Sequence, residues 1–196
     1  MFVINFLFKS NALIWCMRKP AEEEKRTDSI TLRVEKKVLD KLREEANRKM
    51  KSVNVLGNQV LKFYVNWHSP AIDAGFVYID KKNLSRILDK LTETEIDQIL
   101  DEYFETEFVG RLKMITGRIE LNRFLTAMEG WMSGSGLRYR HVTNQDMQSY
   151  VIQHDTGKNA AYYMREYYRR ALEYMKVKNL EVKSTNDTLW IEFTTE

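Results

Sequence analysis

The stretch that decides the N-terminal fold is Ser29-Ile30-Thr31-Leu32-Arg33-Val34, in which polar and apolar residues alternate without a break. A strand with this period places Ser29, Thr31 and Arg33 on one face and the three apolar side chains on the other. A six-residue strand is not stable as an isolated ribbon, and no partner strand lies nearby in the chain. We therefore expect it to pair with the same strand of a second copy, which leaves the polar face exposed.

Two short amphipathic helices are predicted directly after this strand. The first covers about residues 36–49, where the apolar side chains recur at steps of three and four and form one stripe. Ser52 is a good N-cap for the second helix, which covers about residues 53–67 and includes Gly57. Pro70 is expected to end this second helix or its extension. A glycine inside a helix costs about 1 kcal/mol relative to alanine, so Gly57 indicates either close packing of two helices across a dimer axis or a tolerated surface position.

The charge of the chain is unevenly distributed. Residues 17–61 hold 12 Lys and Arg against 8 Asp and Glu, whereas residues 62–196 hold 18 against 20. The basic excess therefore lies in the same segment as the strand and the two helices, and it would double in a dimer. Such an excess suits a polyanion, although a mildly basic solvated surface explains it as well.

Residues 29–65 resemble the ribbon-helix-helix (Arc/MetJ/CopG-like) DNA-binding domains. The resemblance rests on the alternating strand, the Val-Leu-x-x-Leu pattern of the first helix and the Ser-x-Asn start of the second. It implies an intertwined dimer whose paired strands enter the major groove, with Ser29, Thr31 and Arg33 reading bases. Arginine can bind guanine O6 and N7 with two hydrogen bonds, while small hydroxyls discriminate less, so flanking dimers or DNA shape are expected to contribute specificity.

The resemblance also places the start of the second helix against the DNA backbone. Free backbone N–H groups and the positive end of the helix dipole favour phosphate there. Lys25 and Arg26 lie in a charged arm just before the strand and can reach phosphates as well. The predicted phosphate contacts are therefore Ser52, Val53, Asn54, Lys25 and Arg26.

The flanking segments suggest a four-part organisation. Residues 1–16 are apolar but interrupted by Lys9-Ser10-Asn11, too short a run for a membrane span. We expect them to be a dispensable or non-native extension, with Met17 as the initiator, followed by a flexible charged arm over residues 17–28. The ribbon-helix-helix domain is assigned to residues 29–68 and an α+β domain to residues 69–196. A single cysteine, Cys16, fits a reducing, cytoplasmic setting.

The C-terminal part is predicted to be an α+β domain with helices packed on an antiparallel sheet. Its pattern indicates a short strand at residues 75–79, helices at about 81–91, 92–104 and 119–132, and a β-hairpin within 137–154. Residues 106–118 are ambiguous. A tyrosine-rich helix at about 159–175 and a final hairpin within 180–193 complete the domain.

Five residues of this domain are candidates for a ligand pocket. His141 and His154-Asp155 can bind an anion or a metal, and the tyrosines of the last helix can line a cavity, although aromatic side chains at helical spacing usually belong to a core. The candidates are His141, His154, Asp155, Tyr163 and Tyr167. No phosphate loop, nucleophile motif, carboxylate dyad or zinc-ligand spacing is present in the sequence, so we expect no enzyme activity, cofactor or metal.

These patterns together favour a dimeric, sequence-specific transcriptional regulator of prokaryotic type. Its expected partners are double-stranded DNA, a second copy, a higher oligomer on DNA and a small-molecule effector, with no membrane. The C-terminal domain would sense a ligand or add oligomer contacts. One alternative is an antitoxin, whose C-terminal part would grip a toxin. Another is a ligand-binding or enzymatic domain tethered to DNA.

Overall fold

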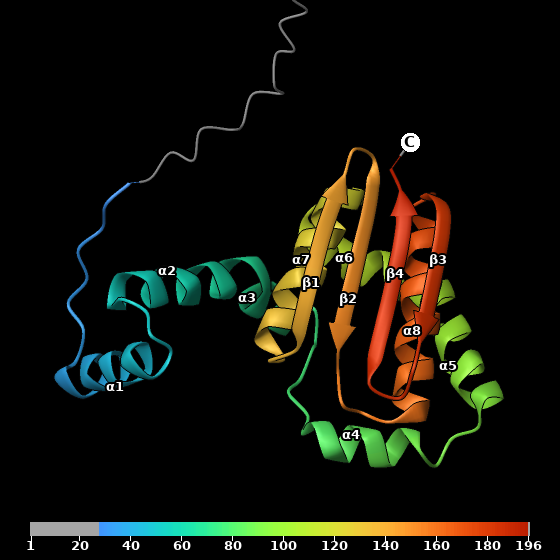
Figure 1. Cartoon of the computed structure of the whole chain (residues 1–196), viewed down its shortest axis with the longest axis horizontal. Coiled ribbons are helices and arrows are strands. Elements are labelled where there is room, and N and C mark those ends of the chain that lie inside the picture. The colour runs from blue at the N-terminus through green and yellow to red at the C-terminus, as the bar shows by residue number, and fades with distance from the viewer. Residues whose placement is uncertain (1–27, 196) are drawn as a thin grey trace, which may run out of the picture.

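The computed structural model describes residues 28–195 and has an α+β architecture, with helices followed by a four-stranded antiparallel sheet (Figure 1). The first helices along the chain are α1 (Lys36–Arg48), α2 (Val53–Phe63), the π-helix η1 (Tyr64–His68), α3 (Ser69–Asp73), α4 (Lys81–Leu88), α5 (Glu93–Thr106) and α6 (Phe108–Thr116). The C-terminal half contains α7 (Leu121–Gly134), β1 (Arg138–Asn144), β2 (Met147–Gln153), α8 (Lys158–Tyr174), β3 (Lys178–Ser184) and β4 (Thr188–Thr194).

The sheet has the order β1-β2-β4-β3, and every neighbouring pair is antiparallel. Successive side chains of a strand point to opposite faces of the sheet, so Tyr150, Ile152, Leu189, Ile191 and Phe193 all lie on one face and are buried. They pack against α6, α7 and α8, which cover one face of the sheet, while none of the described helices covers the other face (Figure 1). This two-layer core is the body of the protein, and it confirms the predicted α+β class with an antiparallel sheet.

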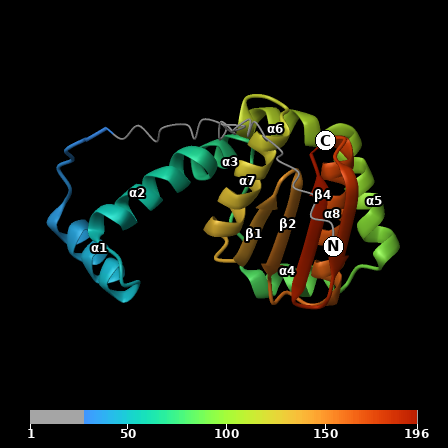
Figure 2. The same ribbon diagram turned by 45° about the horizontal axis from the view of Figure 1, so that its top comes forward.

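A long helical rod joins the body to α1. The segments α2, η1 and α3 follow one another without interruption from residue 53 to residue 73, a length of about 30 Å at 1.5 Å per residue. Figure 2 shows the rod projecting from the body with α1 near its far end. We call α1, α2 and the preceding residues 28–35 the head.

The rod is held to the body by a helix–helix joint with glycines on one side. Phe63 and Trp67, four residues apart on the rod, face Gly130 and Gly134, four residues apart on α7. A Cβ atom at Gly130 would lie 3.0 Å from Cβ of Trp67, and one at Gly134 would collide with the ring of Phe63. Arg111 of α6 adds a hydrogen bond to the carbonyl oxygen of Ala74, just past the end of α3. Close packing at glycine thus fixes the rod against the body.

The structure corrects several sequence-based boundaries. Pro70 does not end the helix, because it stands in the first turn of α3 directly after the π-helix, where its missing N–H is tolerated. Residues 76–80 form no strand; they are irregular, and His68 Nδ1 and the Tyr78 hydroxyl lie 2.6 Å apart across this segment. The ambiguous region contains α6. The capping box at Thr92 and Glu95 is confirmed, since each side chain bonds the other residue's backbone N–H.

Candidate nucleic-acid interface

The segment that sequence analysis predicts as a strand lies at the exposed tip of the head. Residues 28–35 form no strand or helix in the single chain. Their apolar side chains face solvent, with Ile30 74% exposed, Leu32 57% and Val34 44%. The predicted β-α-α unit is therefore not formed by one chain. The physical reason is that a strand needs a hydrogen-bonded neighbour, and the described part of this chain offers none beside this segment.

The two helices of the head pack on each other through a very small core. Ala46 of α1 and Leu56 of α2 are buried, as the predicted stripes require. Several other apolar residues of the two helices are about half exposed. They are Val38, Val55, Val60 and Leu61, with Tyr64 and Val65 following on η1. Together with the three apolar side chains of residues 28–35, they form an unpartnered apolar surface on the head.

The N-terminus of α2 has two backbone N–H donors without an acceptor among the described residues. Ser52 caps it by accepting a hydrogen bond from the backbone N–H of Val55 at 3.2 Å. The backbone N–H groups of Val53 and Asn54 donate to no residue in the described part of the chain. They therefore point two free donors outward at the positive end of the helix dipole. This is the local geometry that the predicted phosphate contacts of Ser52, Val53 and Asn54 require.

The predicted base-reading residues all lie on the exposed segment of the head. Ser29, Thr31 and Arg33 are exposed, and their side chains form no hydrogen bond or ion pair with any residue in the part of the chain that the structure describes. The predicted contacts Lys25 and Arg26 lie outside the described residues, as do residues 1–16 and most of the charged arm. The head thus presents the described members of the predicted DNA-contacting set on a solvent-exposed surface.

No protein-family model, curated protein or solved structure matches this chain.

The candidate pocket residues of the body are not brought together. His141 stacks on Tyr150 with ring centroids 3.9 Å apart, and its Nδ1 lies 2.9 Å from the carboxylate of Glu129 on α7. His154 follows the end of β2, four residues beyond the position paired with His141, which is about 13 Å along a strand. The two histidines therefore do not share a site.

His154 is a fully buried histidine in a tight turn. The backbone N–H of Thr156 donates to Nδ1 at 3.3 Å, so Nδ1 is an acceptor and the neutral ring carries its proton on Nε2. That Nε2 has no partner within residues 28–195. Burial lowers the pKa of His154, while Asp187 and Asp155 oppose the shift and Lys81 reinforces it. This environment keeps the ring neutral and structural.

Tyr163 and Tyr167 belong to an aromatic cluster under the sheet. Tyr167 lies 5.5 Å from Phe104 and 6.2 Å from Tyr103 between ring centroids, and Tyr163 lies 6.3 Å from Tyr167. Burial raises the pKa of both α8 tyrosines, that of Tyr167 strongly. Both side chains are half-buried, and Tyr167 packs against the core, as aromatic side chains at helical spacing usually do.

An ion-pair network that the sequence analysis missed lies on α8. Glu166 is buried, and its carboxylate contacts Arg165 at 3.1 Å, Arg169 at 2.7 Å and Arg170 at 2.9 Å. Arg170 also pairs with Asp97 on α5 at 2.9 Å, so the network ties the two helices together. The i, i+3 and i, i+4 spacing from Glu166 to the two later arginines was the available signal. Among the described residues, no group of His, Cys, Asp or Glu could hold a metal ion and no helix could cross a membrane.

Proposed function

We propose that the chain is a sequence-specific DNA-binding regulator that acts as a dimer through a ribbon-helix-helix head. The main support for this proposal is that Ile30, Leu32 and Val34 are exposed, as are several apolar residues of α1 and α2. Burying apolar surface contributes about 25 cal/mol per Å², so a head with only two buried apolar residues lacks the core for independent stability. A second copy would supply the missing half of that core.

The same pairing would create the DNA-contacting surface. Two strands running side by side place their apolar residues inward and Ser29, Thr31 and Arg33 outward, because the faces alternate. The free N–H groups at Val53 and Asn54 would then bind phosphates on either side of the groove. Base reading by Arg33 and backbone contacts by α2 would therefore act together.

Coupling to the body would run through the rod. The rod is continuous, and its joint with α7 at Gly130 and Gly134 leaves little freedom to slide. A ligand that binds one arrangement of the body better than another would thus bias the spacing of the two heads. An effector-sensing role for residues 69–196 is part of this proposal.

The proposal is tested by comparing Leu32→Asp with Met114→Asp. Both replace an exposed apolar residue by an acid, 57% exposed in the head and 62% exposed on α6 of the body. We expect Leu32→Asp to abolish head dimerisation and DNA binding, because it places a charge in the core of the dimer, while Met114→Asp leaves both intact. Sedimentation velocity and fluorescence anisotropy on mixed-sequence duplex DNA at a fixed salt concentration measure the two effects. Full DNA binding by Leu32→Asp would refute the proposed head.

A further inference from the structure

One end of the body carries a cluster of unneutralised cations on α4 and the turn after it. Lys81, Lys82, Arg86 and Lys90 are exposed, and their side chains form no ion pair or hydrogen bond with any residue from 28 to 195. Most arginines of the body, by contrast, are paired with a carboxylate. Exposed apolar side chains lie among these cations: Ile79 at 50%, Leu84 at 37% and Ile87 at 54%. We call these seven residues the basic surface.

The next helix carries the opposite charge. The sequence of α5 contains six acidic residues and no lysine or arginine. Asp97 and Asp101 are neutralised by Arg170, but the side chains of Glu102 and Glu105 have no partner among the described residues. Ile99 is 49% exposed and lies on the same stripe as Glu102, three residues away. We call Ile99, Glu102 and Glu105 the acidic surface.

We infer that a second copy of this chain binds the basic surface with its acidic surface. In a contact with two-fold symmetry, the basic surface of each copy meets the acidic surface of the other, so Glu102 and Glu105 of both copies gain cationic partners. Ile87 and Ile99 would come together inside the ring of charges and lose their exposure to water. The occupant is a second copy because the complementary charge and the matching apolar residues are both present on the same body.

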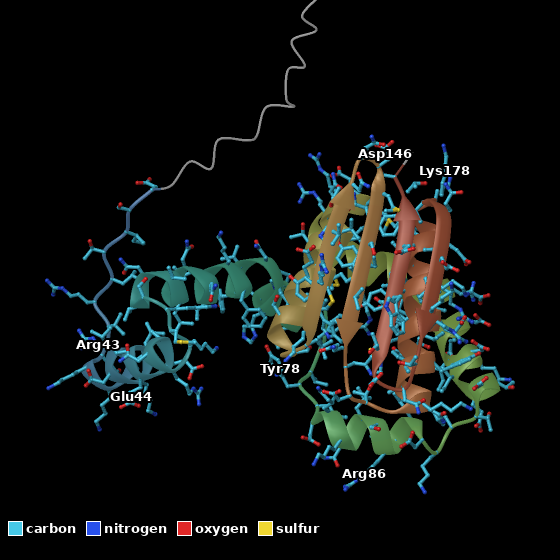
Figure 3. The ribbon with its side chains drawn as sticks, viewed as in Figure 1. Arg43, Glu44, Tyr78, Arg86, Asp146 and Lys178 are labelled. Atoms are coloured by element: carbon cyan, nitrogen blue, oxygen red, sulfur yellow. The ribbon has the colours of Figure 1, made fainter. Side chains whose placement is uncertain are left out.

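This contact is separate from the dimer of the heads. The basic surface belongs to the body, which is held at the far end of a rod of about 30 Å from the N-terminus of α2, where the proposed phosphate contacts lie. Figure 3 places Arg86 at the edge of the body below the sheet, pointing away from it. If the heads dimerise as proposed, contacts between bodies would join dimers and make binding to neighbouring sites cooperative. Only this joining of head dimers and the cooperative DNA binding rest on the proposed function; the body–body contact itself does not.

Charge exchange tests the contact directly. Arg86→Glu and Glu102→Arg should each weaken body–body association at least tenfold, because each places like charges opposite one another. An equal mixture of the two variants should restore association, since the acid introduced at position 86 of one copy then faces the base introduced at position 102 of the other, and the second contact keeps its native pair. Association of the wild type should weaken between 0.1 M and 1 M salt, where the screening length falls from about 10 Å to about 3 Å. Sedimentation velocity of the full chain measures all three effects.

Lys178→Glu is the matched control. It makes the same charge change on an exposed lysine at the opposite end of the body, as Figure 3 shows, and association should be unchanged. Leu32→Asp should abolish the head dimer but leave the body–body contact intact, so this variant should still form dimers through its body. A failure of the body–body contact can therefore be distinguished from a failure of the head dimer. Failure of the mixture to restore association would overturn the inference. The inference would also be overturned if the wild type showed no body–body association but bound anionic phosphatidylserine vesicles, and Arg86→Glu did not bind them.

Discussion

Replacing Gly130 with alanine tests the joint between the rod and the body. Alanine inside a helix is normally about 1 kcal/mol more favourable than glycine. Here the new Cβ would lie 3.0 Å from Cβ of Trp67, an atom attached directly to the rod's backbone that cannot swing aside. Overpacking of this kind costs about 1–3 kcal/mol. The net effect should therefore range from neutral to about 2 kcal/mol of destabilisation.

Gly110→Ala separates the clash from the helix preference. Gly110 lies within α6, and no atom stands within 4 Å of the Cβ that would be added there. Both variants gain the same helix preference, so Gly130→Ala should be less stable than Gly110→Ala by about 1–3 kcal/mol. For a chain of this size that is roughly 2–12 °C in Tm, measurable by calorimetry. Equal stabilisation by the two substitutions would refute the close packing of rod and body.

Three further substitutions test the body. Glu166→Gln should lower the free energy of unfolding in urea by about 2–3 kcal/mol, because a buried carboxylate that three arginines share becomes neutral. The exposed control Glu173→Gln should lower it by less than about 1 kcal/mol, and equal losses would contradict the network. Thr92→Ala should lower the free energy of unfolding by about 1 kcal/mol because α5 loses its N-cap. An unchanged urea midpoint would argue against a stabilising role for this cap. Burial lowers the pKa of His154 in the folded protein, so as the pH falls the unfolded chain takes up a proton at His154 before the folded protein does. The free energy of unfolding should therefore fall as the pH drops below 6.5, the ordinary pKa of histidine. The same decline in His154→Gln would rule out His154 as the source.

Local signals in the sequence predicted most elements of the body. The Thr92 and Glu95 pair marks a helix start by its chemistry alone, and alternation of apolar residues marks β2 and β4. The helix through Pro70 could not be predicted, because its continuation depends on the π-helix that precedes it and on the packing of Trp67 against α7. Tertiary packing overrode the local preference there.

Some candidate site residues could likewise be predicted from local sequence, whereas others depended on tertiary packing. The predicted DNA-contacting residues follow from a periodic pattern and a helix start, and those that the structure describes all belong to the head or to the turn before α2. The pocket candidates were chosen by residue type. Strand register separates His141 from His154, and ring packing leaves Tyr163 and Tyr167 half-buried beside the helices. The basic and acidic surfaces were missed because each charge alone is ordinary. Only the structure distinguishes paired cations such as Arg170 from those such as Arg86, which has no partner among residues 28–195.

The most direct test of the proposed DNA-binding role of the head is selection from a random duplex library with wild type and Arg33→Ala at fixed salt. The wild type should enrich a motif of two half-sites related by two-fold symmetry. Arg33→Ala should lose about 1–3 kcal/mol on that motif and accept other bases at one position in each half-site. Failure of the wild type to enrich any motif, or an identical motif from Arg33→Ala, would refute base reading by the head.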